Sequence, residues 1–207
     1  FQTAARPPEA RGTDRCSRSV PPSSNASCAV YNAKPMFFSF DGIDGVGKTT
    51  QIAQFCDWLR GLGHDIVTCR DPGSTPLGEA IRGLLLDRHD LAIHRRAEML
   101  LYMAARAQLV EEVIRPALDA GKTVVCDRFL LANVVYQGHA GGLDVETVRA
   151  VGQIAIHSIV PAKVFLLDMD IDAAAQRIQR PPDRMELQGR EFRRRVRDGF
   201  LLEASKN

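Results

Sequence analysis

The sequence predicts an α/β fold in which a doubly wound parallel sheet carries helices on both faces. From Met36 onward, short apolar runs of strand length alternate with longer stretches of helical periodicity. The first apolar run leads directly into a glycine-rich turn and then into a helix. Alternating strands and helices imply parallel strands joined by crossover helices, so binding groups should gather beyond the carboxyl ends of the strands.

The elements follow one another in a regular order along the chain. The predicted strands are the apolar runs 36–40, 65–69, 123–126 and 163–167. The first predicted helix follows the glycine-rich turn and ends near residue 62. Three more helices are predicted at 76–86, 98–120 and 144–158, and a last one runs through about residue 204. Gly63 and Gly121 follow two of these helices, and glycine is the usual residue at a helix carboxyl end because it adopts the left-handed conformation without strain.

Length and composition indicate one medium-sized domain. The chain has 207 residues with a formal net charge of +2 and an apolar fraction of 45%. This charge is too small to predict a nucleic-acid or membrane partner, and no apolar run approaches the roughly twenty residues that cross a bilayer. We assign the domain to residues 36–207.

Residues 1–35 differ from the rest, because they are rich in Pro, Ser, Arg and Ala and have no sustained periodicity. Such a composition predicts a disordered N-terminal extension. Translated sequence upstream of a true start at Met36 is an alternative. A transit peptide is another, although Glu9 and Asp14 argue against it.

The cysteines predict a reducing compartment. There are five of them, and none forms a C-x-x-C pair typical of a metal site. Cys69 and Cys126 end apolar runs, and Cys56 lies on an apolar helix face, so these three read as small buried hydrophobic residues. We therefore expect a cytoplasmic protein.

The strongest single motif is a phosphate-binding loop, the segment Gly42-Ile43-Asp44-Gly45-Val46-Gly47-Lys48-Thr49. It matches G-x-x-x-x-G-K-[ST] and lies between a predicted strand and a predicted helix, which is the context that the motif requires. Glycines let backbone N–H groups surround phosphate oxygens, Lys48 neutralises phosphate charge, and the Thr49 hydroxyl helps to hold Mg²⁺. The motif predicts a P-loop NTPase fold that binds ATP.

Three further segments carry groups suited to a second, phosphorylated substrate. Arg70 follows the strand 65–69, and Arg128 follows the strand 123–126. Tyr102 and Arg106 are four residues apart and so share one helix face. Arginine forms bidentate bonds with phosphate, and an aromatic ring offers a stacking surface for a base. Taken alone, this pair favours an ordinary amphipathic helix, with Tyr102 as a core residue and Arg106 as a solvated one.

Four segments taken together resemble the thymidylate kinase family: FDGIDGVGKTTQ, RDPGST, LLYMAARAQLVEEVIRPAL and DRFLLANVVYQG. The resemblance runs from about Met36 to the last residue. It implies ATP-dependent phosphorylation of thymidine monophosphate (dTMP) to the diphosphate in dTTP biosynthesis. It also implies Mg²⁺ with ATP as cofactor and a homodimer without nucleic-acid or membrane partners.

The same resemblance implies roles for individual residues. The aromatic ring at Tyr102 stacks on thymine and Arg106 bonds to the base. The positions of Arg128 and Arg70 contact the substrate, the former at its phosphate. Asp44 lies near the metal and the acceptor sugar. The remaining family contacts fall on Asn133 and Gln137 at the base and on Tyr136 at the deoxyribose.

The sequence departs from the usual family pattern at four positions. Ala132 stands where serine is common, Asp71 where glutamate is more frequent, Ser74 where glycine is found, and Val135 where alanine is usual. These changes affect the shape of the base pocket and remove no charge that phosphoryl transfer needs.

A basic, proline-broken segment at 177–186 has the form expected of a closing lid. In family members with a small residue at the position of Gly45, the catalytic arginine comes from the lid. The resemblance therefore assigns this role to Arg177, Arg180 and Arg184, with Arg184 as the strongest candidate. The later arginines, 190–197, read as a solvated helix face.

Two other functions remain open at this point. One is a kinase for a different monophosphate with a shifted pocket, and the other is a nucleotide-binding module without catalysis. The family normally adds a strand and a helix after the last predicted helix, and we see neither before residue 207. We therefore expect one uncovered sheet edge, one uncovered apolar face, poor solubility and low activity.

Overall fold

The computed structural model describes residues 35–206. In this part of the chain, four parallel strands form one sheet in the order β2-β3-β1-β4. The strands are β1 (Phe37–Asp41), β2 (Ile66–Arg70), β3 (Thr123–Asp127) and β4 (Lys163–Leu166). Each predicted strand is thus confirmed, whereas the predicted disorder of residues 1–35 falls, except for Pro35, outside the described residues.

The register of the sheet brings the carboxyl ends of the strands to one edge. Phe40 on β1 pairs with Asp127 on β3, and Arg70 on β2 pairs with the same Asp127. Asp41 on β1 pairs with Leu166 on β4. The loops that follow these residues therefore start side by side, as the parallel arrangement predicts.

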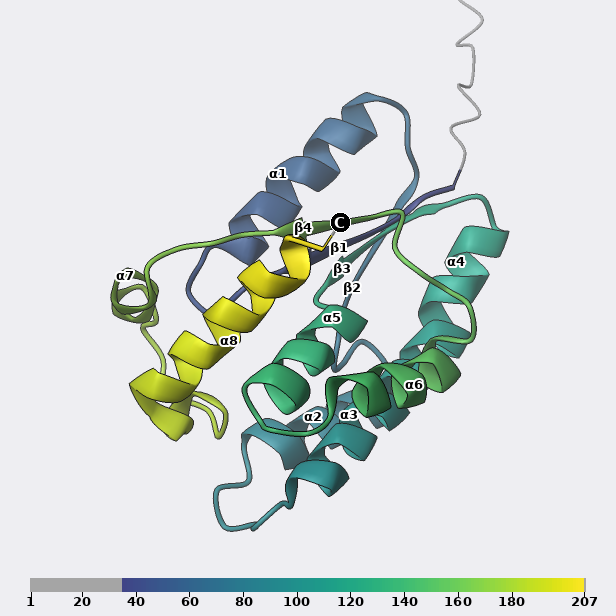
Figure 1. Ribbon diagram of the computed structural model, residues 1–207. Coiled ribbons are helices and arrows are strands. Elements are labelled where there is room, and N and C mark those ends of the chain that lie inside the picture. The colour runs from purple at the N-terminus through teal and green to yellow at the C-terminus, as the bar shows by residue number, and fades with distance from the viewer. Residues whose placement is uncertain (1–34, 207) are drawn as a thin grey trace, which may run out of the picture. The chain divides into compact units, whose positions relative to one another are not determined.

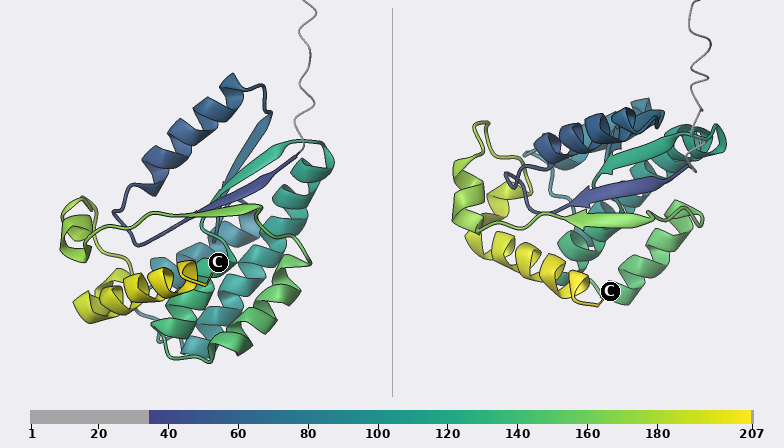
Figure 2. Two further views of the ribbon diagram at one scale, coloured as in Figure 1. Left: turned by 45° about the horizontal axis from the view of Figure 1, so that its top comes forward. Right: turned by 90° about the horizontal axis from the view of Figure 1, so that it is seen from above.

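Different helices cover the two faces of the sheet (Figures 1 and 2). On one face, Phe38 of β1 packs with Cys56 of α1 (Lys48–Gly61). On the other face, Phe37 packs with Leu109 and Ile114. Successive strand residues point to opposite faces, so a strand covered on both sides is buried along its whole length. All five residues of β1 are buried, including Ser39 and Asp41.

The other helical segments of the described residues complete these layers. They are α2 (Pro76–Leu86), α3 (Arg95–Leu109), the π-helical η1 (Val110–Ile114), α4 (Arg115–Asp119), α5 (Leu130–Asn133), the π-helical η2 (Val134–His139), α6 (Val145–Ile156), α7 (Ile171–Gln176), the 3₁₀ turn η3 (Glu186–Gln188) and α8 (Gly189–Ala204). The doubly wound α/β class is confirmed.

Capping side chains set the start of two helices. The Thr75 hydroxyl accepts from the backbone N–H of Gly78, and Pro76 occupies the first turn of α2. The Asp144 carboxylate accepts from the N–H of Thr147 at the start of α6. Both caps satisfy N–H groups that have no partner inside the helix, so the helices begin where the sequence places them.

Strand β4 forms one edge of the sheet within residues 35–206. Its side chains Val164 and Phe165 are 43% and 37% exposed. Both side chains are therefore partly open to solvent at this edge. Among the described residues, no helix is long and apolar enough to cross a membrane.

Candidate active site

The glycine-rich loop after β1 is closely packed as well as open to phosphate. Gly42 and Gly45 have φ values of 136° and 81°, which side chains rarely tolerate. A Cβ on Gly42 would lie 2.3 Å from the carbonyl oxygen of Leu167, and one on Gly45 would lie 2.1 Å from that of Ala174. Only glycine therefore fits at these two positions.

Lys48 places a cation inside this loop. Its Nζ donates to the carbonyl oxygens of Gly42 and Ile43 at 3.1 and 2.9 Å. Burial of Lys48 lowers its pKa to about 8, with the nearby charge of Arg128 acting in the same direction. The ammonium also lies 3.8 Å from Asp44 Oδ1, but its two hydrogen bonds go to neutral carbonyl oxygens, which a phosphate can replace.

Arg128 links the loop to the strand β3 side of the site. Its backbone has a φ of 68°, and its guanidinium donates to Gly42 O at 2.8 Å and to Asp44 Oδ1 at 2.6 Å. The ring of Tyr136 lies under the guanidinium, 5.2 Å from its carbon. Burial would raise the pKa of Asp44, but the charges of Arg128 and Lys48 lower it to about 2. Asp44 is therefore an anion at neutral pH.

A basic cleft opens beside the loop. Arg82, Arg177 and Arg180 line it together with the loop residues Lys48 and Thr49. Thr49 is exposed in the first turn of α1. A helix amino end and several cations facing one cleft create a strong anion site.

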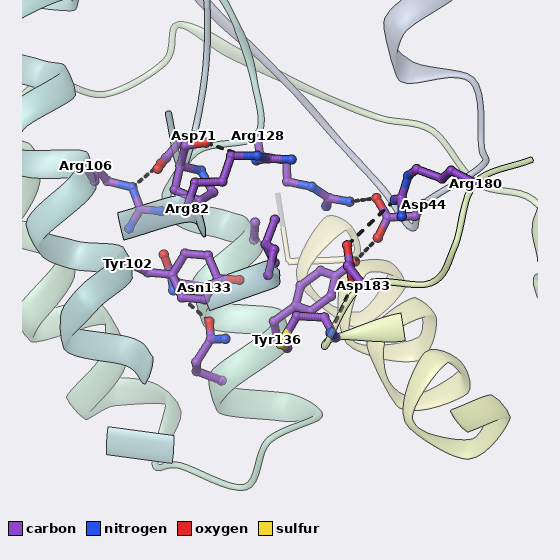
Figure 3. A pocket seen from close by; sticks show the side chains of 15 residues that line it. Asp44, Asp71, Arg82, Tyr102, Arg106, Arg128, Asn133, Tyr136, Arg180 and Asp183 are labelled. Carbon is purple, nitrogen blue, oxygen red and sulfur yellow. Dashed lines mark hydrogen bonds and ion pairs between the residues drawn. The ribbon is translucent and has the colours of Figure 1, made fainter. Parts of the chain in front are cut away.

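A second, more enclosed pocket adjoins this cleft (Figure 3). The two pockets share one set of charged lining residues, namely Asp44, Asp71, Arg82, Arg128 and Arg180. This shared wall lets two bound molecules meet end to end.

The inner end of the second pocket carries the residues that suit a base. Tyr102 lies there beside Arg106, whose Nε donates to Asp71 Oδ2 at 2.5 Å. Arg106 is only 1% exposed. The Asn133 amide donates to Gln137 Oε1 at 2.7 Å, and both amides line the pocket.

Comparisons with known proteins agree with this geometry. A family model described as thymidylate kinase matches residues 40–207. This places the match over most of the chain. The chain belongs to the thymidylate kinase family.

Individual members of the family cover most of the chain. A thymidylate kinase of Rhodopirellula baltica is 42% identical over 182 residues, which are 88% of this chain and 74% of that protein. A thymidylate kinase of Finegoldia magna is 41% identical over 176 residues, covering 83% of this chain and 87% of that protein. The crystal structure of thymidylate kinase from Ehrlichia chaffeensis superposes with a TM-score of 0.70 at 32% identity, covering 84% of this chain and 88% of that one.

These comparisons confirm the resemblance, the P-loop NTPase fold and the enzyme class. The chain is a thymidylate kinase, a phosphotransferase of nucleotide biosynthesis that acts on dTMP.

Most of the residues that the thymidylate kinase motifs single out come together. The second pocket is lined by Tyr102, Arg106, Arg128, Asn133, Tyr136 and Gln137. Arg70 lies instead on the wall of the basic cleft, where it pairs with Glu79 at 2.7 Å and remains half exposed. The lid residues Arg177 and Arg180 line the same cleft.

Arg184 lies elsewhere, which differs from its prediction as the strongest lid candidate. Its guanidinium donates to Glu98 and to the carbonyl oxygen of Leu85 at 2.6 Å, and its backbone N–H donates to Leu86 O at 3.1 Å. It lines a groove beside His89 and not the cleft of the glycine loop. In this arrangement Arg184 attaches the lid to α2 and α3.

Sequence reasoning missed three polar residues of the site. Arg82 and Asp183 line the pockets, and Glu98 lies behind them with no exposed surface. Arg82 donates to Pro72 O at 3.0 Å, so it fixes the loop that also carries Asp71. Glu98 precedes Tyr102 by four residues on the same face of α3, but an acid in the first turn of a helix is ordinarily exposed, so this spacing alone does not reveal it.

Proposed function

We propose that the basic cleft holds ATP, that the enclosed pocket holds dTMP, and that the phosphoryl group moves between them past Asp44, Arg128 and Arg180. The observation that carries this proposal is the wall shared by the two pockets. Phosphoryl transfer depends chiefly on positioning and charge stabilisation, and this wall combines both.

On the donor side, backbone N–H groups of the glycine loop and the amino end of α1 face the phosphates. Lys48 exchanges its two carbonyl acceptors for β- and γ-phosphate oxygens. Thr49 and Asp44 supply a hydroxyl and a carboxylate, and few protein oxygens suffice for Mg²⁺ when substrate phosphates and water complete its shell. The metal, when bound, neutralises charge on the transferred group.

On the acceptor side, Arg128 grips the dTMP phosphate and Tyr136 supports the sugar. The ring of Tyr102 stacks on thymine, Arg106 and Asn133 contact its polar edge, and Gln137 acts on the base through its hydrogen bond to Asn133. Support comes from the lining of the pocket: Arg128 and Arg180 lie to one side of it, and Tyr102 and Asn133 lie to the other (Figure 3). This order of groups matches a nucleotide entering base first.

The lid completes the charge stabilisation. Arg180 lines both pockets and its charge contributes to the low pKa of Asp44, so it lies near the path of the phosphoryl group. Arg177 lies against the glycine loop, with its guanidinium within 4 Å of where a Cβ on Gly47 would stand. Both can meet negative charge that develops during transfer. A catalytic role for Arg184 requires it to leave Glu98.

The test is ADP formation from Mg-ATP with dTMP, compared with the other common nucleoside monophosphates. We expect dTMP to give the highest kcat/KM. Preference for another acceptor would replace dTMP in the proposal. Nucleotide binding without any ADP formation would favour the non-catalytic module.

We also propose a homodimer that works in the cytoplasm. Exposed leucines on adjoining helices support a dimer face: Leu77 on α2 is 49% exposed and Leu100 on α3 is 54% exposed. Cys69 and Cys126 occupy paired positions on β2 and β3 and are free thiols, which suits a reducing compartment. Sedimentation equilibrium measures the dimer directly.

A further inference from the structure

Glu98 is the most deeply buried carboxylate among the described residues that approach the dTMP pocket. It lies on α3 with 0% exposure. Arg184 of the lid donates to its Oε2, and Arg95 donates to its Oε1 at 3.1 Å. The third donor is the side-chain amide of Gln137, whose Nε2 lies 3.0 Å from Oε1. A buried charge with three donors is a costly arrangement that needs a reason.

The contact between Glu98 and Gln137 fixes the direction of an amide. A carboxylate with arginine partners only accepts hydrogen bonds, so Gln137 must turn its NH₂ group toward Glu98. Its carbonyl oxygen then faces the other way and accepts from Asn133 Nδ2 at 2.7 Å. The Asn133 amide is fixed in turn, because its NH₂ group is committed to Gln137.

The result of this relay is a single polar atom directed at the pocket. Asn133 is 2% exposed and lines the pocket, and its Oδ1 is buried without a hydrogen-bond partner. A buried, unpaired carbonyl oxygen in a binding pocket requires a donor from the ligand. Reversing either amide would present NH₂ there instead.

We propose that Glu98 is a positioning residue that sets the base specificity of the enzyme, by holding Gln137 and Asn133 so that a carbonyl oxygen meets the base. This inference rests on the proposed function, in which the base occupies the inner end of the pocket. Thymine and uracil carry an N–H donor at N3, whereas cytosine carries an acceptor there. The fixed Asn133 oxygen therefore accepts from thymine and uracil and repels the lone pair of cytosine.

The 5-methyl group plays no part in this selection. Uracil and thymine present the same N3–H, so the relay distinguishes both from cytosine and does not distinguish them from each other. A merely structural role of Glu98 would weaken all three acceptors together. Comparison of dTMP, dUMP and dCMP thus separates the two explanations.

The decisive variant is Glu98→Gln, which keeps the shape of the side chain and lets both amides reverse. In the full chain, we expect the ratio of kcat/KM for dTMP over dCMP to fall at least about tenfold. The reason is that Asn133 is no longer held with its oxygen toward the base, so it can present NH₂ to the N3 acceptor of cytosine. The ratio for dTMP over dUMP stays unchanged. Gln137→Leu interrupts the relay without removing the arginine partners of Glu98, and it lowers the same ratio even if Glu98→Gln folds poorly.

A matched control and a rescue complete the test. Glu203→Gln neutralises another buried carboxylate, which is 4% exposed and paired with Arg149 outside the pocket, and it leaves both ratios unchanged. The double variant Glu98→Gln/Gln137→Glu restores an obligatory acceptor for Asn133 Nδ2. It should return the dTMP over dCMP ratio to within about threefold of the wild-type value.

The possible outcomes distinguish the role of Glu98 from the proposed function on which that role rests. Wild-type protein that does not phosphorylate dTMP contradicts the proposed function itself. Wild-type activity on dTMP together with an unchanged dCMP ratio in Glu98→Gln and Gln137→Leu overturns the role of Glu98 alone. A parallel fall for dUMP and dCMP, or failure of the double variant to recover, overturns it as well.

Discussion

Replacing Asp71 by asparagine should strongly destabilise the protein, because it leaves the guanidinium of Arg106 buried without its counter-charge. The two side chains are 3% and 1% exposed and meet at 2.5 Å. Removing one partner of a buried pair costs about 3–5 kcal/mol, and the retained amide oxygen places Asp71→Asn near 3 kcal/mol. For a domain of this size, that corresponds to a decrease in Tm of about 6–12 °C.

The pair is costly to break although it contributes little by itself. Burial raises the pKa of Asp71 even though Arg106 opposes the shift, so pairing does not fully offset the loss of hydration. We therefore expect the double variant Asp71→Asn/Arg106→Gln to be much less destabilised than the sum of the two single variants.

Thermal and urea unfolding of the three variants measure these differences. Asp57→Asn is the control, because the Asp57–Arg60 pair at 2.8 Å is mostly exposed, and its loss should cost less than about 0.5 kcal/mol. A Tm for Asp71→Asn equal to that of the control, or strictly additive effects in the double variant, would refute the reasoning.

Three further outcomes follow from the site. Arg180→Ala should lower kcat at least about a hundredfold with little change in KM for ATP, whereas Arg184→Ala should lower kcat less and Tm more; steady-state kinetics and melting curves check both. Lys48→Met should abolish measurable turnover while circular dichroism stays native, and wild-type turnover in it would contradict the donor site. Burial raises the pKa of Asp41 to about 7, although the charges of Arg128 and Lys48 act to lower it. Neutral Asp41 therefore favours the folded state fully below about pH 4, and this contribution is lost as the pH rises to about 7. Asp41→Asn should therefore stabilise the protein at pH 8 and not at pH 4, and equal effects at both pH values in urea titrations would argue against this.

The strands and the glycine loop could be predicted because their signals are local. The strand Phe37–Asp41 carries three phenylalanines, and all five of its residues are buried because both faces of the sheet are covered. The helical segment after β3 could not be predicted from hydrophobic periodicity. Val134, Val135 and Gln137 are all at most 1% exposed, so this short helix has no exposed face that would mark its period.

The parts of the site that could not be predicted depend on partners far apart in the sequence. Glu98 in the first turn of α3 looks like an ordinary exposed acid at a helix start. Its burial and its role depend on hydrogen bonds from Gln137 and Arg184, which are distant in the sequence. Arg184 itself was placed by its motif, but its position follows from the carbonyl oxygens of Leu85 and Leu86 at the end of α2. No spacing within the lid reveals that attachment.

The close contacts of Gly42 with Leu167 and of Gly45 with Ala174 bear on how such loops are inherited. Both glycines are required by packing against the chain that leads into the lid, independently of any phosphate. A descendant that had lost catalysis would thus still be selected to keep them in order to fold. In this architecture, retained loop glycines indicate that the protein folds, and they do not indicate that it is active. Catalytic activity is indicated instead by Lys48 and the cations around it.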